Sequence, residues 1–276
     1  MSFSSDWKLD LADIGALRLQ HARRAFNDRD PQLALVEAEE LLDDEPDNLD
    51  ALLIVADAAL ELGDPAVSRA AFLQAIDLGA SSALLMSGLA VACYELTDLD
   101  GCVEASNRAL ELEPAHAEAW YYKGVALDQL GRADEARVAL SQATYHDPKS
   151  FPLPTEMSTE DIQLLLGQAL SCMPTELAKW FAQVRFELHR YPDLNALRDG
   201  EMPLSPSAPA LYHGTPPDQR ADPWSSTPDK VDVYVGNLER AAALGADLTQ
   251  LLAASLRNEA LDWLGLGDDQ LPLSRP

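Results

Sequence analysis

The sequence predicts an α-solenoid of four helix pairs over residues 15–150, followed by a small α/β domain over residues 157–276. Small and apolar residues recur with a fixed period in the first half, and this periodicity stops after Ser150. The second half combines short extended apolar segments with a proline-rich stretch and a final amphipathic helix. A chain of 276 residues is long enough for two domains, so we place the boundary after Ser150.

The first half divides without a gap into four units of equal length, 15–48, 49–82, 83–116 and 117–150, after a lead-in segment, 1–14. The last unit carries the repeated positions most fully, with Trp120, Gly124, Leu127, Gly131, Ala136, Leu140, Ala143 and Pro148. Two helices can approach closely only where side chains are small, which explains the recurring alanines and glycines. The period and the pattern resemble the tetratricopeptide repeat. A generic alanine-rich helical bundle is the alternative.

In tetratricopeptide proteins the first helices of the units line a concave peptide-binding face, so the resemblance implies a groove here. Its slots hold Arg23, Phe26, Asn27, Leu53, Asp57, Leu60, Glu61, Val91, Tyr94, Glu95, Tyr121, Val125 and Asp128, with Ser87 and Glu118 at further slots. Arg23 and Asn27 match the clamp by which some such domains hold a carboxylate, but the many acidic slots would repel one. We expect a protein or peptide partner in which basic and apolar residues alternate. The alternative is a solvated face of an acidic protein.

A degenerate metal motif lies near the C-terminus, in the segment 258–268. The zinc-protease helix H-E-x-x-H places two imidazoles one turn apart, with a glutamate as general base. Here Asn258 and Asp262 stand in the two histidine slots, Glu259 stands in the glutamate slot, and Asp268 stands where an x-x-G-x-x-D extension would supply a third ligand. An amide oxygen is a poor zinc ligand. An ordinary amphipathic helix over residues 247–264 is the alternative.

Further landmarks precede this motif in a fixed order. They are a helix that opens at Ser158, the segment Met173–Leu177, extended stretches at Val184–Leu188 and Val231–Val235, one long proline-rich loop between them that includes Leu211–Pro216, and a helix start at Asn237–Arg240. The C-terminal half resembles a bacterial family of minimal zincin-like metallopeptidases, related to the matrix-metalloprotease core. The resemblance implies a zincin-like domain over residues 157–276, joined to the repeats by a linker, 151–156. The peptidase activity of that family requires the two histidines that this sequence lacks.

We therefore predict a non-catalytic adaptor that needs no metal or cofactor, in which the repeats bind a partner and the second domain is a pseudo-metallopeptidase. One alternative is an active metallopeptidase with a rearranged metal site, whose repeats recruit the substrate. Such a site would require His189 or His213 to reach Asp268. The other alternative is a cytoplasmic chaperone of the secretion type, because acidic tetratricopeptide proteins commonly hold apolar segments of exported proteins.

The strongly acidic composition bears on which classes of partner the chain can bind. The formal net charge is −26, and residues 1–150 hold 11 Lys and Arg against 28 Asp and Glu. Nucleic acids and anionic membranes are disfavoured as partners because no basic cluster is present. The N-terminal residues lack the apolar core of a signal peptide, so we expect a cytoplasmic protein without membrane insertion. Cys93 and Cys102 fall on core positions of the third unit, where a disulfide between them is conceivable.

Overall fold

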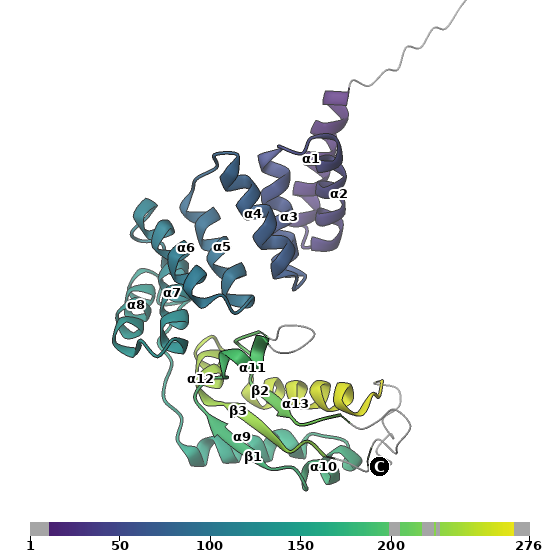
Figure 1. Ribbon diagram of the computed structural model, residues 1–276, viewed down its shortest axis with the longest axis vertical. Helices are drawn as coiled ribbons and strands as arrows, with labels where there is room; N and C mark the ends of the chain where they lie inside the picture. The colour runs from purple at the N-terminus through teal and green to yellow at the C-terminus, as the bar shows by residue number, and fades with distance from the viewer. Residues whose placement is uncertain (1–10, 199–204, 217–223, 225–226, 268–276) are drawn as a thin grey trace, which may run out of the picture. The chain divides into compact units, whose positions relative to one another are not determined.

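The computed structural model describes residues 11–198, 205–216, 224 and 227–267. The chain forms two compact units, residues 1–146 and 147–276 (Figure 1). No helix in the described part of the chain is both long enough and apolar enough to cross a bilayer.

The first unit is a stack of helix pairs, as the repeat pattern predicts (Figure 1). The pairs are α1 (Leu11–Asn27) with α2 (Pro31–Asp44), α3 (Leu49–Glu61) with α4 (Pro65–Asp77), α5 (Ala83–Glu95) with α6 (Leu99–Leu112), and α7 (Ala117–Gln129) with α8 (Ala133–His146). Helices α3, α5 and α7 begin at residues 49, 83 and 117, the expected first residues of their repeats. Only α1 begins earlier than its repeat.

Polar N-caps set the start of five of these helices. The capping side chains accept a hydrogen bond from the backbone amide three residues ahead at 3.0 to 3.1 Å, and they are Asp30, Asn48, Asp64, Ser82 and Asp98. Such a cap satisfies an amide that has no partner within the helix. A proline occupies the first turn of α2 and of α4, where no amide donor is needed.

The turn between the two helices of each pair contains one residue in the left-handed region, always at the fifteenth position of the repeat. These residues are Arg29 (φ 65°), Gly63 (φ 78°), Thr97 (φ 60°) and Gly131 (φ 77°). Glycine adopts this conformation without steric cost, whereas a residue with a Cβ atom is strained there. Two of the four repeats therefore carry a non-glycine residue at a position that favours glycine.

We expect Gly63→Ala to lower the free energy of unfolding of the repeats by about 1 kcal/mol. No atom lies within 4 Å of the position of the new Cβ, so the cost is conformational rather than a clash. The reciprocal change Arg29→Gly, at the equivalent exposed position, is expected to raise stability by less, because glycine gains entropy in the unfolded chain. Urea unfolding followed by circular dichroism measures both variants. A shift of both variants in the same direction would contradict this account.

Close packing explains the small residues of the repeats. A Cβ on Gly124 would lie 2.7 Å from Cγ of Leu140, and a Cβ on Gly88 would lie 2.9 Å from Cε2 of Phe72. Both large side chains occupy position 24 of their repeats, so each fills the space that a glycine leaves. Cys93 and Cys102 are buried free thiols, not a disulfide.

The second unit combines a three-stranded sheet with several helices. Its helices are α9 (Thr159–Ser171), α10 (Thr175–Phe181), α11 (Leu194–Arg198), α12 (Val235–Ala243) and α13 (Leu248–Leu264). Its strands are β1 (Phe186–His189), β2 (Ala210–His213) and β3 (Lys230–Tyr234), in the order β1-β3-β2. Strand β3 lies at the centre, parallel to β1 and antiparallel to β2.

Two predicted helices of this unit are confirmed. Helix α9 opens at Ser158 with a capping box, in which Ser158 and Asp161 each bond the other's backbone amide. Helix α13 is capped by Asp247 and ends at Gly265, which has φ 63°. The amide of Leu266 bonds the Leu261 carbonyl across this end, the pattern of a helix terminated by a left-handed glycine.

The prediction of one long loop between the two extended stretches was wrong. Ala210–His213 forms the edge strand β2, and α11 lies in the same interval. Prolines on both sides keep β2 to four residues, too short for a clear alternating pattern. An edge strand tolerates flanking prolines because one of its sides needs no ladder hydrogen bonds.

Alternation along the strands separates two faces of the sheet. Phe186, Leu188, Val231, Val233 and Tyr212 pack into the hydrophobic core with residues of α9, α10 and α13. The intervening residues lie on the opposite face, because side chains alternate along a strand.

Buried polar residues at the start of α12 secure the surrounding loops. Asn237 Nδ2 donates to the carbonyls of Pro206 at 2.9 Å and Ala208 at 2.6 Å. Glu239 accepts a hydrogen bond from the Met157 amide at 2.8 Å. The Asn237–Arg240 segment therefore holds together parts of the unit that are far apart in sequence.

Candidate functional site

The first helices of the pairs, α1, α3, α5 and α7, line the concave face in a stack of this kind, and we call this surface the groove. Asp57 and Glu61 lie one turn apart on α3, and Glu118 lies in the first turn of α7. On α5, between them, the buried Ser87 hydroxyl donates to Glu118 Oε2 at 2.8 Å. Three successive first helices thus contribute to one polar site.

The charges of Glu61 and Glu118 act on the ionisation of Asp57. Burial, and then the charges of Glu61 and Glu118, raise the pKa of Asp57 to about 6. Among the described residues, none forms a salt bridge with Asp57 or Glu61. A positive charge placed beside Asp57 would favour its ionised form. Asp57 and Glu61 thus lie near a third carboxylate, Glu118, without a salt bridge to any residue that the structure describes.

Aromatic rings border these carboxylates. The Tyr121 and Tyr122 rings of α7 meet edge to face, with centroids 5.4 Å apart, and Tyr122 meets the Tyr94 ring of α5 at 5.7 Å. Burial raises the pKa of Tyr122, and the charges of Glu95 and Glu118 add to this shift. Tyrosine faces next to carboxylates form a favourable environment for a guanidinium or an ammonium group.

The structure gives the predicted groove residues different environments. Arg23 forms an ion pair with Asp50 at 2.7 Å. Of the two residues that match the carboxylate clamp, Arg23 and Asn27, the charged one therefore already has an acidic partner. Tyr94 and Val125 are 2% and 1% exposed and belong to the packing between helices. Half-buried side chains are Phe26, Leu53, Asp57, Leu60, Val91, Glu95, Tyr121 and Asp128, and exposed ones are Asn27 and Glu61.

The sequence analysis missed Tyr122. Its repeat position is not a groove slot, yet its ring and its coupling to Glu95 and Glu118 place it beside the acidic site. The doublet Tyr121-Tyr122, in helices otherwise rich in alanine, was the available signal.

The degenerate motif lies on the last turns of α13. Asn258 and Asp262 are exposed and one turn apart, and Glu259 is half-buried beside them. Burial raises the pKa of Glu259, and the Asp262 charge adds to this effect. Tyr212 of β2 donates a hydrogen bond from its hydroxyl to the Leu256 carbonyl at 2.7 Å. Burial, and then the Glu259 charge, raises the pKa of Tyr212, so this phenol stays protonated.

These donors fit a catalytic zinc ion poorly. Zinc peptidases hold the metal with two histidines and a third protein ligand, whereas the two histidine positions here carry an amide and a carboxylate. The position of the third ligand, Asp268, lies outside the described residues. His189 and His213 lie on the sheet face opposite α9, α10 and α13, where both contact Asp232. No step of metal-dependent hydrolysis can be derived from this helix.

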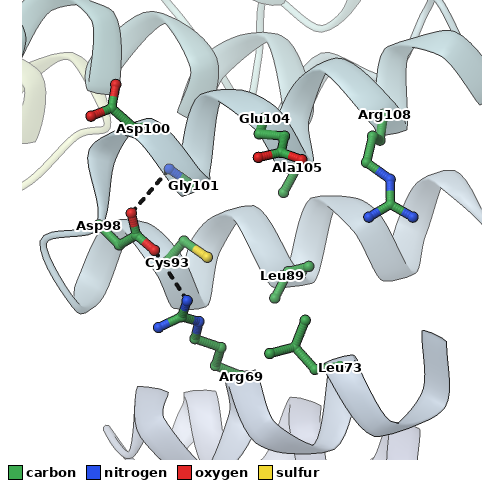
Figure 2. A pocket seen from close by; sticks show the side chains of 10 residues that line it. All are labelled: Arg69, Leu73, Leu89, Cys93, Asp98, Asp100, Gly101, Glu104, Ala105 and Arg108. Atoms are coloured by element: carbon green, nitrogen blue, oxygen red, sulfur yellow. Dashed lines mark hydrogen bonds and ion pairs between the residues drawn. The ribbon is translucent and has the colours of Figure 1, made fainter. Parts of the chain in front are cut away.

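A cavity of about 410 Å³ opens between α4 and α6 over α5 (Figure 2). Figure 2 shows the Asp98 carboxylate between the Gly101 amide, at 3.0 Å, and the Arg69 guanidinium, at 3.2 Å. Burial raises the pKa of the Cys93 thiol to about 11, so the thiol is not an activated nucleophile at neutral pH. The described residues of this cavity form a structural ion pair rather than a catalytic site.

Models of known protein families match both halves of the chain. The tetratricopeptide repeat models match residues 19–83, 56–105 and 97–153, and the zincin-like metallopeptidase model matches residues 181–274. No curated protein matches the chain.

Three similar solved structures each cover about half of the chain. MamA 41-end from Desulfovibrio magneticus RS-1 is 20% identical, covering 50% of this chain and 77% of that one, with a TM-score of 0.47. YrrB, described as a TPR protein with an unusual peptide-binding site, is 20% identical over 48% of this chain and 68% of its own, with a TM-score of 0.44. PilW, a type IV pilus biogenesis factor, is 21% identical over 49% and 63%, with a TM-score of 0.43. The family matches therefore place tetratricopeptide repeats in the first half of the chain and a zincin-like metallopeptidase domain in the second half.

Proposed function

We propose that the chain is a non-catalytic adaptor whose groove binds a partner protein through a segment that combines lysine or arginine with apolar residues. The zincin-like domain then serves as a further docking surface that does not cleave. The observation that carries this proposal is the raised pKa of Asp57, because it indicates neighbouring carboxylates that are partly desolvated and, for Asp57 and Glu61, form no salt bridge within the described part of the chain.

The groove supports a partner of mixed character. A basic side chain beside Asp57 and Glu118 would relieve the repulsion among the three carboxylates, and Tyr121 offers it an aromatic face. Leu84, 71% exposed on α5, offers contact to an apolar neighbour of that side chain. Neither an acidic tail nor a free carboxylate finds such complementarity, since Arg23 is already paired with Asp50.

The absence of cleavage is inferred from the chemistry of the motif positions. Asn258 and Asp262 supply no imidazole, and Glu259 can act as a general base only on a water molecule that another group has activated. The proposed role therefore retains the fold of the domain and the shape of its surface but not the reaction of its family.

A panel of fluorescent peptides tests the proposal. We expect peptides with alternating basic and apolar residues to bind, and the Asp57→Asn/Glu61→Gln variant to bind them about tenfold more weakly or worse. The control is Glu39→Gln/Asp43→Asn, which removes two exposed carboxylates with the same spacing from α2. Equal losses in both variants would show that only net charge attracts the peptides. Mass spectrometry of the bound peptide detects any cleavage, which would contradict the adaptor role.

A further inference from the structure

The face of the sheet opposite the helices carries a cluster of metal-ligating side chains. Glu187 and His189 lie two residues apart on β1, Asp232 lies on β3, and His213 lies at the end of β2. Glu187 and Asp232 are direct partners in the parallel ladder, so their side chains stand next to each other on the same face. Three strands thus place two carboxylates and two imidazoles together.

The separations suit a small cation. His189 Nε2 lies 3.3 Å from Asp232 Oδ1 and 3.6 Å from Glu187 Oε2, and a ligand atom of each of the three residues lies within 4.8 Å of the others. Ligands bound tetrahedrally to zinc at roughly 2.0–2.1 Å are about 3.4 Å apart. His213 Nε2 approaches from the other side, 2.8 Å from Asp232 Oδ2.

Burial and bonding at Asp232 provide a second, independent observation. The Asp232 side chain is only 9% exposed, although it lies on the sheet face opposite α9, α10 and α13. Neither its Oδ1 atom nor His213 Nε2 takes part in a hydrogen bond among the described residues, although both atoms are buried. Buried polar atoms without a hydrogen bond are uncommon, and an ion is one of the groups that satisfies them. Asp232 Oδ1 lies near Lys230 Nζ and His189 Nε2, and His213 Nε2 lies near Asp232 Oδ2, without the directed geometry of a hydrogen bond.

Lys230 already places a positive charge in this cluster. Its Nζ atom lies 2.9 Å from Glu187 Oε2 and 2.9 Å from Asp232 Oδ1. The Lys230 side chain is 25% exposed, so its flexible stem has access to solvent. The ammonium group therefore neutralises the two carboxylates, and it can leave without a rearrangement of the strands.

We infer that Glu187, His189, Asp232 and His213 form a divalent-cation site, and that Lys230 takes the place of the ion when none is bound. Imidazole together with carboxylate favours zinc over calcium or magnesium, which prefer oxygen ligands alone. This site lies on the sheet face opposite α13 and does not include Asn258, Glu259 or Asp262. A bound ion would tie the three strands together.

Calorimetry tests this inference. The full chain, prepared without a histidine tag, is titrated with zinc sulfate. The wild-type chain is expected to bind one zinc ion. His189→Ala, a change at an exposed side chain, is expected to weaken binding by at least tenfold. Lys230→Met is expected to strengthen binding, because it removes the competing ammonium while keeping the apolar stem. The control His21→Ala, at an exposed position on α1, is expected to bind as the wild type does.

Three results would overturn the inference. The first is a wild-type chain that binds no zinc, and the second is a His189→Ala variant that binds as tightly as the wild type. The third is binding in Lys230→Met alone, because Lys230 would then be the permanent cation of the cluster. Asp232→Asn is a second ligand variant, and circular dichroism shows whether it remains folded. Replacing zinc with cobalt adds a visible absorption spectrum, whose intensity distinguishes tetrahedral from octahedral coordination.

Discussion

Asn258→His combined with Asp262→His is expected to create a zinc site on α13 whose affinity exceeds that of the parent helix by more than about 100-fold, since altering even the residues that support zinc ligands commonly changes affinity by 10–100-fold. The two positions are exposed and one turn apart, so imidazoles fit there without disturbing the core. Glu259 remains beside them, where its carboxylate can accept a proton from zinc-bound water.

The measurement is zinc titration in a His189→Ala background, which removes a ligand of the proposed sheet site and so isolates α13. Asn258→Ala/Asp262→Ala in the same background is the matched control, because it makes the same positions apolar without supplying ligands. A tight site in the histidine variant would show that the geometry of a zinc-binding helix has been kept. If both variants bind zinc equally weakly, the assignment of Asn258 and Asp262 to the ligand slots is wrong.

The repeats could be predicted in detail because their determinants are local. The N-cap side chains reach only three residues ahead, and the left-handed turn residues recur with the repeat itself, as Gly63 and Gly131 show. The two ends of α13 could be predicted for the same reason, since Asp247 and Gly265 act within one helical turn. Each of these features depends on a few neighbouring residues.

The edge strand and the cluster on the sheet depend instead on pairing across long separations. Glu187 meets Asp232 only because β1 lies parallel to β3, and His213 reaches the same carboxylate only because β2 pairs on the other side. No local pattern specifies that order of strands. The scattered histidines therefore gave no metal-binding spacing in the sequence, although two of them contact one aspartate in the fold.

For the groove, the sequence indicates the positions of the side chains but not their surroundings. The repeat register placed Asp57 and Glu118 on the concave face, but not how closely they approach or which rings enclose them. The burial of Tyr94 and Val125 follows from the way α5 and α7 pack, a tertiary effect that repeat positions do not encode. Side chains at equivalent positions therefore differ in exposure.

Asp57→Asn is expected to stabilise the repeats at neutral pH while it weakens binding of a basic partner. The pKa of Asp57 is raised to about 6 in the folded chain, from an ordinary value of 3.8. The folded state therefore holds this proton more tightly than the unfolded state does. Below pH 3.8 both states are protonated, so the carboxyl group imposes no penalty. As the pH rises from 3.8 to about 6, the wild-type chain progressively loses stability relative to the variant, and above about pH 6 the loss is complete.

A shift of this size corresponds to at most about 3 kcal/mol, and the groove's contact with solvent reduces it to about 1–2 kcal/mol at pH 7. Urea unfolding of wild type and Asp57→Asn between pH 4 and pH 8 measures the difference, and Asp43→Asn on α2 controls for the change in net charge. A difference that is already complete at pH 4 would show that the variant acts through packing rather than through this carboxylate. If Asp57→Asn raises the free energy of unfolding but weakens partner binding, Asp57 serves recognition rather than folding. A carboxylate that only solvated the surface would change neither quantity when replaced.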